Sequence, residues 1–192
     1  MKLSKIQKKV EKALSEKRYE HTLGVAYTAA ALAMRYGADI DGARTAGILH
    51  DCAKNLGDEK LISLCEKYNL PVSDCERENP FLLHGKVAAL IGRKKFKIED
   101  EDILNAVTYH TTGRPDMSLL EKIIFISDYI EPNRDTAPNL STIRALAFED
   151  IDMCLIKILE DTLNYLNGRR SSVDPMTQKT YDYYMKEDVL NG

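Results

Sequence analysis

The chain has 192 residues, of which 44% are hydrophobic, and its formal net charge is −3. This length and apolar content suffice for one full hydrophobic core. The slight negative charge excludes a general basic surface for nucleic acid, so a phosphate ligand would depend on local lysine and arginine side chains.

The cysteines and the longest apolar run exclude further classes of protein. The four cysteines are irregularly spaced without a Cys-x-x-Cys pair, so we interpret them as reduced thiols. The longest mostly apolar run, 24–34, is too short to span a bilayer. The N-terminal segment 1–12 lacks the apolar stretch and cleavage site of a signal peptide. We therefore expect a cytoplasmic protein that binds neither membrane nor nucleic acid.

Apolar residues recur at intervals of three and four in the first half of the chain, which predicts helices. The first helix begins near Leu3 and ends near Ser15. The next elements are a helix 17–36 that stops at Gly37, a helix capped by Asp39 or Asp41 that runs to His50, a helix 58–68, and a turn-rich connection 69–80.

The same spacing continues in the second half. Pro80 can occupy the first turn of a helix that extends to about 95, and acidic residues open a helix 99–110. Ser118 can cap the most apolar helix of the chain, which contains Asp128. Helices 140–147 and 149–166, a loop 168–177 and a last helix toward Leu190 follow. Because extended alternation is absent, the sequence predicts an all-α bundle.

All four histidines lie on or at the end of predicted buried helices. These are His21, His50, His84 and His110. Each alone is more simply a core histidine, and the adjacent Asp51 is more simply a solvated helix end. However, Asp128 interrupts the most apolar helix, and no lysine or arginine lies one turn before or after it. A buried carboxylate needs a cationic partner, so the six residues together favour a metal site.

The ligand types limit the kind of metal. Nitrogen and oxygen ligands without thiolate do not fit a structural zinc site. Six of them fit either one octahedral metal with open positions or two metals that share a carboxylate. Iron, manganese and zinc all accept such ligands, so the sequence alone does not choose among them.

Several basic residues flank these ligands. Arg18 precedes His21 by three residues and Lys54 follows Asp51 by three, so on continuous helices each would lie on the face of its ligand. Arg114 and Arg134 belong to the loops after His110 and Asp128. Each alone is more simply a solvated surface charge, but together they predict a phosphate ligand.

Three longer strings identify a family resemblance. LHDCAKN at 49–55, YHTTGRP at 109–115 and SDYIEPNR at 127–134, with the order of the histidines and aspartates, resemble the HD-domain superfamily of metal-dependent phosphohydrolases, and within it the bacterial YqeK family. The resemblance implies a single HD domain over 1–192, with an all-α bundle core over about 17–135. It also implies that C-terminal helices, about 139–190, pack on this core and close a nucleotide site.

The resemblance also implies a ligand set. The first metal would be bound by His21, His50, Asp51 and Asp128. His84 and His110 would complete the ligands of the second metal and lie next to the substrate. Asp51 would bridge the two metals. The family is described as containing a di-iron centre, so we expect two divalent or trivalent ions, iron first and manganese or zinc as alternatives.

Substrate contacts follow from the same resemblance. The family's C-terminal segment contributes to the nucleotide site, and Pro175, Thr177 and Tyr181 match its pattern. Asp182 stands where the family pattern has asparagine, which leaves a base contact from this position unsupported. We expect Arg18, Lys54 and Arg134 to contact the phosphates.

The implied activity is the symmetrical hydrolysis of diadenosine tetraphosphate to two ADP molecules. We hypothesise that a hydroxide shared by the two metals attacks a central phosphorus, with Asp51 and Lys54 as the catalytic residues. Two alternatives stay open: another HD-type nucleotidase or (deoxy)nucleoside triphosphate hydrolase, and a non-catalytic nucleotide sensor. The partner is a dinucleoside polyphosphate or another nucleotide, and a homodimer is compatible with the sequence.

Overall fold

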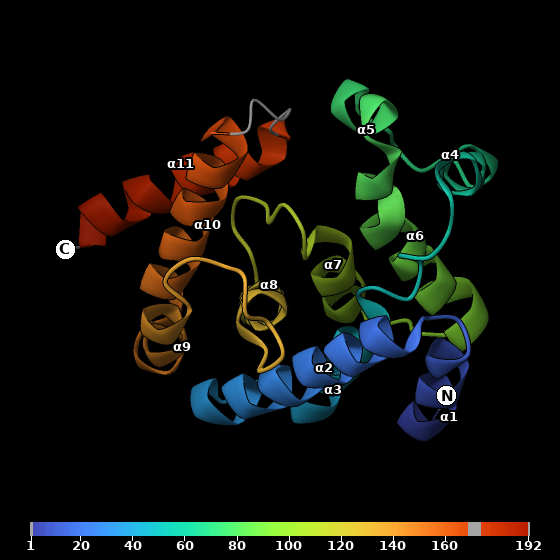
Figure 1. Ribbon diagram of the computed structural model, residues 1–192, viewed down its shortest axis with the longest axis horizontal. Helices are drawn as coiled ribbons and strands as arrows, with labels where there is room; N and C mark the ends of the chain where they lie inside the picture. The colour runs from blue at the N-terminus through green and yellow to red at the C-terminus, as the bar shows by residue number, and fades with distance from the viewer. Residues whose placement is uncertain (1, 169–173, 192) are drawn as a thin grey trace.

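The computed structural model describes residues 2–168 and 174–191, with side chains as far as Lys186, and all regular secondary structure in these residues is helical (Figure 1). This confirms the predicted all-α class. In chain order the elements are α1 Leu3–Glu11, α2 Glu16–Tyr36, α3 Ile40–Leu49, α4 Asp58–Lys67, α5 Asp74–Glu78, η1 Pro80–Leu83, α6 His84–Ile91, η2 Gly92–Phe96, α7 Glu101–Tyr109, α8 Leu119–Ile130, α9 Leu140–Glu149, α10 Ile151–Gly168 and α11 Pro175–Asn191.

Helices α2 and α3 form a tightly packed pair. Gly37 ends α2 in the left-handed region at φ 73°, and the Asp39 carboxylate caps α3 by accepting a hydrogen bond from the Asp41 backbone N–H. A Cβ atom at Gly47 would lie 2.7 Å from the Cα of Ala26. The absence of a side chain at Gly47 thus allows the C-terminal end of α3 to lie against α2.

Helix α8 is the central element. The Ser118 side chain and Glu121 form a capping box at its start, as the sequence predicted for Ser118. Both Ile124 and Ile126 are fully buried. Helix α8 contacts α2, α3, α7 and α10, and Figure 1 shows it between α7 and α10. Side chains on α8 can therefore meet residues from distant parts of the chain.

The C-terminal helices lie against this centre. Helix α10 packs on α8, α9 and α11. Tyr184 of α11 is buried, and its hydroxyl accepts a hydrogen bond of 2.8 Å from the backbone N–H of Met117, just before α8. This contact fixes α11 to the loop that leads into the central helix.

The predicted connection 69–80 contains the short helix α5, which the sequence analysis did not predict. Its cap is a capping box: the Ser73 hydroxyl accepts from the Glu76 N–H, and the Glu76 carboxylate accepts from the Ser73 N–H at 2.8 Å. Lys86 also donates to this buried carboxylate, at 2.7 Å. Tertiary contact with α6 therefore supports a helix that is too short to show a periodic pattern.

The predicted helix 80–95 is not continuous. Pro80 does begin the first helical turn, but that turn is a 3-10 helix, and α6 starts at His84. After α6 the helix widens into a π-helical turn, η2. This turn is terminated by Lys97, whose backbone lies in the left-handed region at φ 59°. One irregular segment thus replaces the regular helix that we expected.

Two predicted boundaries were also wrong. Helix α1 ends at Glu11 rather than near Ser15, because the chain turns where the Ala13 N–H bonds to the Val10 carbonyl. Helix α11 begins at Pro175, inside the predicted loop 168–177, since the Asp174 carboxylate accepts from the Met176 N–H and caps it.

Among the described residues, every helix is too short or too polar to cross a bilayer.

Candidate metal centre

The side chains predicted as metal ligands come together between α2, α3, α6, α7 and α8. They are His21, His50, Asp51, His84, His110 and Asp128. His21 and Asp128 lie within α2 and α8. His50 and His110 directly follow the last residues of α3 and α7, and His84 is the first residue of α6. Helix ends thus supply most of the cluster.

Three of the histidines are oriented by their own helical turns. Nδ1 of His50, His84 and His110 lies 2.7, 2.6 and 2.7 Å from the carbonyl oxygen of the residue three positions earlier. A carbonyl can only accept, so each Nδ1 carries the proton and donates. Nδ1 of His21 lies 3.0 Å from the Glu131 carboxylate, which imposes the same tautomer. In the neutral rings, all four Nε2 atoms therefore present a lone pair.

These lone pairs face other electron-rich atoms. Nε2 of His84 lies 3.1 Å from Nε2 of His110 and 3.2 Å from Oδ1 of Asp51. Nε2 of His50 is buried and has no hydrogen-bond partner in the described part of the chain. Lone pairs at such distances repel unless they share a cation. Neutral imidazole nitrogens and carboxylate oxygens are ligands that a divalent metal accepts. The cluster therefore has the ligands of a metal-binding site.

Asp51 separates the histidines into two pairs. Its Oδ2 lies 3.6 Å from Nε2 of His50 and 4.0 Å from Nε2 of His21. Its Oδ1 lies 3.2 Å from Nε2 of His84 and 3.7 Å from Nε2 of His110. The side chain is only 4% exposed. One carboxylate thus offers one oxygen to each pair.

Asp128 lies beside the first pair. Its Oδ1 is 2.9 Å from Nε2 of His21 and 3.9 Å from Nε2 of His50. Arg134 donates to the same oxygen at 2.9 Å and to the Asp128 backbone carbonyl at 2.8 Å. No lysine or arginine lies one turn from Asp128, as the sequence showed, but a cationic partner comes from the loop after α8. The converging lone pairs, and not an unpaired Asp128, are therefore the feature that indicates a metal.

Two other predicted phosphate contacts also touch the cluster. Arg18 donates to Oδ2 of Asp51 at 3.0 Å, and its side chain is 37% exposed. Nζ of Lys54 lies 3.2 Å from Nε2 of His84 and 4.0 Å from Oδ1 of Asp51. Burial lowers the pKa of Lys54. Both cations are therefore next to the ligands and partly open to solvent.

Arg114 does not join them. Its guanidinium makes two hydrogen bonds, of 2.7 and 2.8 Å, to the buried carboxylate of Glu121 on α8. The expectation that Arg114 flanks the ligands as a phosphate contact was wrong, because this ion pair holds it at the start of α8.

Burial sets the charge of the cluster. It lowers the pKa of His50 to about 4 and also lowers that of His84, so both rings are neutral at pH 7. Burial alone would raise the pKa of Asp51 and Asp128, but the surrounding histidines hold both well below the usual range. Neutral imidazoles and ionised carboxylates are the forms that bind a divalent cation.

The chain segment that contains this cluster matches a known family. The model of the HD domain matches residues 18–133, a segment that begins just before His21 and ends just after Glu131. The chain belongs to the HD-domain family. The predicted all-α HD fold and the predicted resemblance are thus confirmed.

Relatives of known name narrow the place of this HD protein. It is 41% identical to a Bacillus subtilis protein named symmetrical bis(5'-nucleosyl)-tetraphosphatase, over 91% of this chain and 92% of the relative. A Staphylococcus aureus protein of the same name is 37% identical over 98% and 97%. A crystal structure of a predicted HD superfamily hydrolase involved in NAD metabolism from Clostridium acetobutylicum has a TM-score of 0.94 and 40% identity, and it covers 97% of this chain and 98% of its own.

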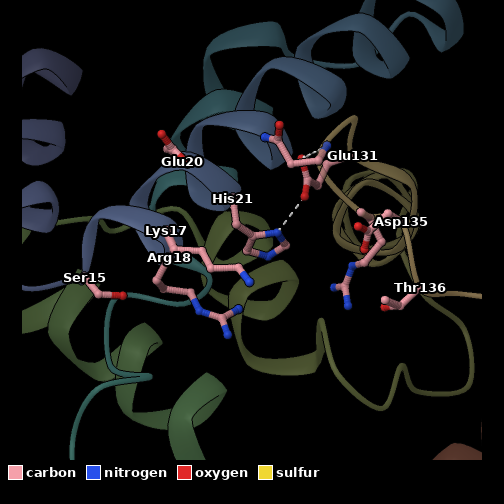
Figure 2. Close-up of a pocket in the computed structure, with 10 residues that line it drawn as sticks. Ser15, Lys17, Arg18, Glu20, His21, Glu131, Asp135 and Thr136 are labelled. Carbon is pink, nitrogen blue, oxygen red and sulfur yellow. Dashed lines mark hydrogen bonds and ion pairs between the residues drawn. The ribbon is translucent and has the colours of Figure 1, made fainter.

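A cavity of about 380 Å³ opens beside the first pair of ligands in the HD core (Figure 2). His21, Arg18 and Arg134 line it. Figure 2 shows Lys17 and Arg18 on the same side as His21, with Asp135 and Thr136 across from them. The cavity thus gives solvent access to the cluster of predicted metal ligands and places basic side chains beside it.

A second cavity, of about 310 Å³, lies near the other pair of ligands. Thr111 lines it, and the Thr111 hydroxyl is 3.2 Å from Nε2 of His110. Pro175 lines it as well, from the start of α11. Thr177 is buried, and Tyr181 packs against the hydrophobic core, so neither contributes to this cavity.

Glu131, which is 1% exposed and contacts His21, was not predicted as a site residue. Its signal was present, since an acidic residue directly follows the most apolar helix within the string SDYIEPNR. No helical spacing relates it to His21, because the two residues are 110 positions apart.

Proposed function

We propose that this protein is a metal-dependent phosphoric anhydride hydrolase that cleaves diadenosine tetraphosphate symmetrically into two ADP molecules. Relatives that are 37% to 42% identical over almost the whole chain bear the name of this activity. The observation that carries the proposal is the position of Asp51, with one oxygen toward each histidine pair.

In this proposal the cluster would hold two metals, and Asp51 would contribute one carboxylate oxygen to each. His21, His50 and Asp128 complete the first position, and His84 and His110 complete the second. The support is geometric: groups of ligand atoms from these residues lie within 4.8 Å of one another. We propose iron in both positions, with manganese or zinc as functional substitutes.

Each group has a defined task. Bound divalent metals supply a water that is nucleophilic near neutral pH and stabilise charge on phosphate oxygens. Arg18, Lys54 and Arg134 then neutralise the non-bridging oxygens of the polyphosphate. Attack of water on a central phosphorus breaks the middle anhydride bond, and the two products are ADP. Lys54 and Asp51 are the proposed catalytic residues.

The two nucleosides of the substrate require more room than the space between the predicted metal ligands offers. We propose that the cavity beside His21 takes part of the polyphosphate, since Arg18 and Arg134 line it. We also propose a nucleotide contact at the second cavity, which Pro175 lines, and we propose that the C-terminal helices close the site there. Contacts of Thr177 and Tyr181 with substrate stay predictions. We further propose a cytoplasmic enzyme whose partner is a free nucleotide.

Product analysis tests the proposal. Metal-stripped protein is supplied with Fe²⁺ or Mn²⁺ and incubated with diadenosine tetraphosphate in ¹⁸O-labelled water. We expect ADP as the sole nucleotide product, with one ¹⁸O on the terminal phosphate of half the molecules. AMP together with ATP would contradict symmetric cleavage. Faster release of phosphate or pyrophosphate from nucleoside triphosphates would favour a nucleotidase, and binding without turnover would favour a sensor.

A further inference from the structure

His21 is held differently from the other histidines of the cluster. His50, His84 and His110 each donate from Nδ1 to a backbone carbonyl of their own chain segment. His21 lies within the long helix α2, and its Nδ1 lies 3.0 Å from the carboxylate of Glu131. Figure 2 shows this contact as the dashed line between the His21 ring and Glu131. The orientation of His21 thus depends on a side chain from the residue that directly follows α8.

Glu131 is itself firmly held. Its Oε2 accepts a hydrogen bond of 2.8 Å from the Asn133 N–H. Its backbone carbonyl accepts from the Arg144 guanidinium at 2.9 Å, and its backbone N–H bonds to the Ser127 carbonyl. Because the Glu131 side chain is 2% exposed, little solvent reaches its contact with the His21 ring. The carboxylate is therefore a fixed acceptor.

Gly24 provides the space for this carboxylate. It lies three residues after His21 on the same helix. A Cβ atom at Gly24 would lie 3.0 Å from Cδ of Glu131 and only 2.2 Å from its Oε2, and the second distance is shorter than real contacts allow. Any larger residue at position 24 would displace the carboxylate from His21.

We propose that Glu131 is the positioning residue for His21 and sets the metal affinity of the His21–His50–Asp128 position, and that Gly24 makes this possible. The inference rests on the proposed two-metal site. A carboxylate that accepts the Nδ1 hydrogen bond fixes the ring and keeps the proton on Nδ1. It also makes Nε2 a stronger electron-pair donor to a metal than a backbone carbonyl in the same position would. The second position, at His84 and His110, does not use this carboxylate.

The test measures Mn²⁺ binding alone. Metal-stripped wild type, Glu131→Gln, Gly24→Ala and Gly57→Ala are titrated with Mn²⁺ by equilibrium dialysis. Gly57→Ala is the matched control, because a Cβ atom there meets nothing within 4 Å. We expect two Mn²⁺ per wild-type chain. In Glu131→Gln and Gly24→Ala, affinity at one position falls about 10- to 100-fold and the other is unchanged. Gly57→Ala matches wild type.

A second readout separates positioning from general damage. Excess Mn²⁺ should restore kcat of Glu131→Gln toward the wild-type value, whereas a misfolded site would not recover. Wild-type affinity at both positions in Glu131→Gln, or equal loss at both, overturns the inference while the two-metal function stands. Fewer than two Mn²⁺ in the wild type overturns both together.

Discussion

Asp51 is the residue on which the site depends, because two histidine pairs converge on its separate oxygens. Its neighbours show why sequence reasoning found it: His50 and Asp51 are adjacent, so the end of one helix delivers both groups. The same reasoning could not find the Asp128–Arg134 pair, because that contact requires a loop to fold back by six residues. Local spacing predicts ligands, and tertiary structure decides their partners.

Substitution of Asp51 tests its role directly. Asp51→Asn keeps the shape of the side chain but removes the charge that both metal positions would share. We expect bound metal to fall below one ion per chain and kcat to fall by more than about 100-fold. Metal analysis and the ADP assay measure these effects. Asp41→Asn serves as control, since that side chain is 89% exposed. Full metal content in Asp51→Asn would contradict the bridging role.

The buried histidines predict how stability depends on pH. Burial lowers the pKa of His50 to about 4 and also lowers the pKa of His84, whereas in the unfolded chain both titrate near 6.5. Between these values the unfolded state binds more protons, so the free energy of unfolding decreases as pH falls from 6.5. For His21, burial lowers the pKa, but Asp128 and Glu131 offset this and raise it overall. Its contribution therefore changes only above pH 6.5.

Urea unfolding of metal-stripped protein at pH 7, 6 and 5 measures this dependence. We expect the free energy of unfolding to fall by about 1 kcal/mol or more per pH unit below 6.5. Stability that is constant from pH 7 to pH 5 would show that these rings are already protonated in the folded protein.

Close helix packing sets the distance between the second pair of ligands. Gly85 follows His84 at the start of α6, and a Cβ atom there would lie 2.7 Å from the backbone carbonyl oxygen of Thr108 on α7. Helix α7 ends beside His110. The 3.1 Å between the two Nε2 atoms thus depends on the absence of a side chain at Gly85.

Gly85→Ala should therefore separate α6 from α7. The neighbour is backbone and cannot rotate away, so we expect a loss of about 1–3 kcal/mol of stability and weaker Mn²⁺ binding at the second position only. Calorimetry and Mn²⁺ titration measure the two effects, and Gly57→Ala again provides the unstrained control. Unchanged Mn²⁺ binding would show that the helices adjust without moving the histidines.

The elements that the sequence predicted well are the long ones. The boundaries of α2 were predicted within one residue, and the start of α8 was predicted from its cap at Ser118. Helix α5 was missed, although its capping box, Ser73 and Glu76, was readable as Ser-x-x-Glu. The break between Pro80 and Phe96 was not readable, because an apolar stripe continues through it. Short or irregular elements depend on contacts that periodicity does not encode.

At the scale of the whole molecule, the predicted metal ligands come from segments spread along the chain between residues 21 and 128. Metal binding to the folded state alone should therefore stabilise the entire chain. At a concentration 100 times Kd, this stabilisation is about 2.7 kcal/mol, which for a chain of this size raises Tm by about 5–10 °C. Calorimetry with and without Mn²⁺ measures the shift. Asp51→Asn should show little of it, and an equal shift in that variant would place the bound metal elsewhere.

The contact between Gly24 and Glu131 also has a consequence for evolution. The two positions are 107 residues apart in the chain, yet the atoms of one occupy the space that any side chain at the other would need. We therefore expect the two positions to be selected as a pair, so that a lineage that gains a side chain at position 24 also shortens or replaces the acid at 131. In an alignment of relatives, these two columns should change together, while glycines in open loops such as Gly57 vary independently.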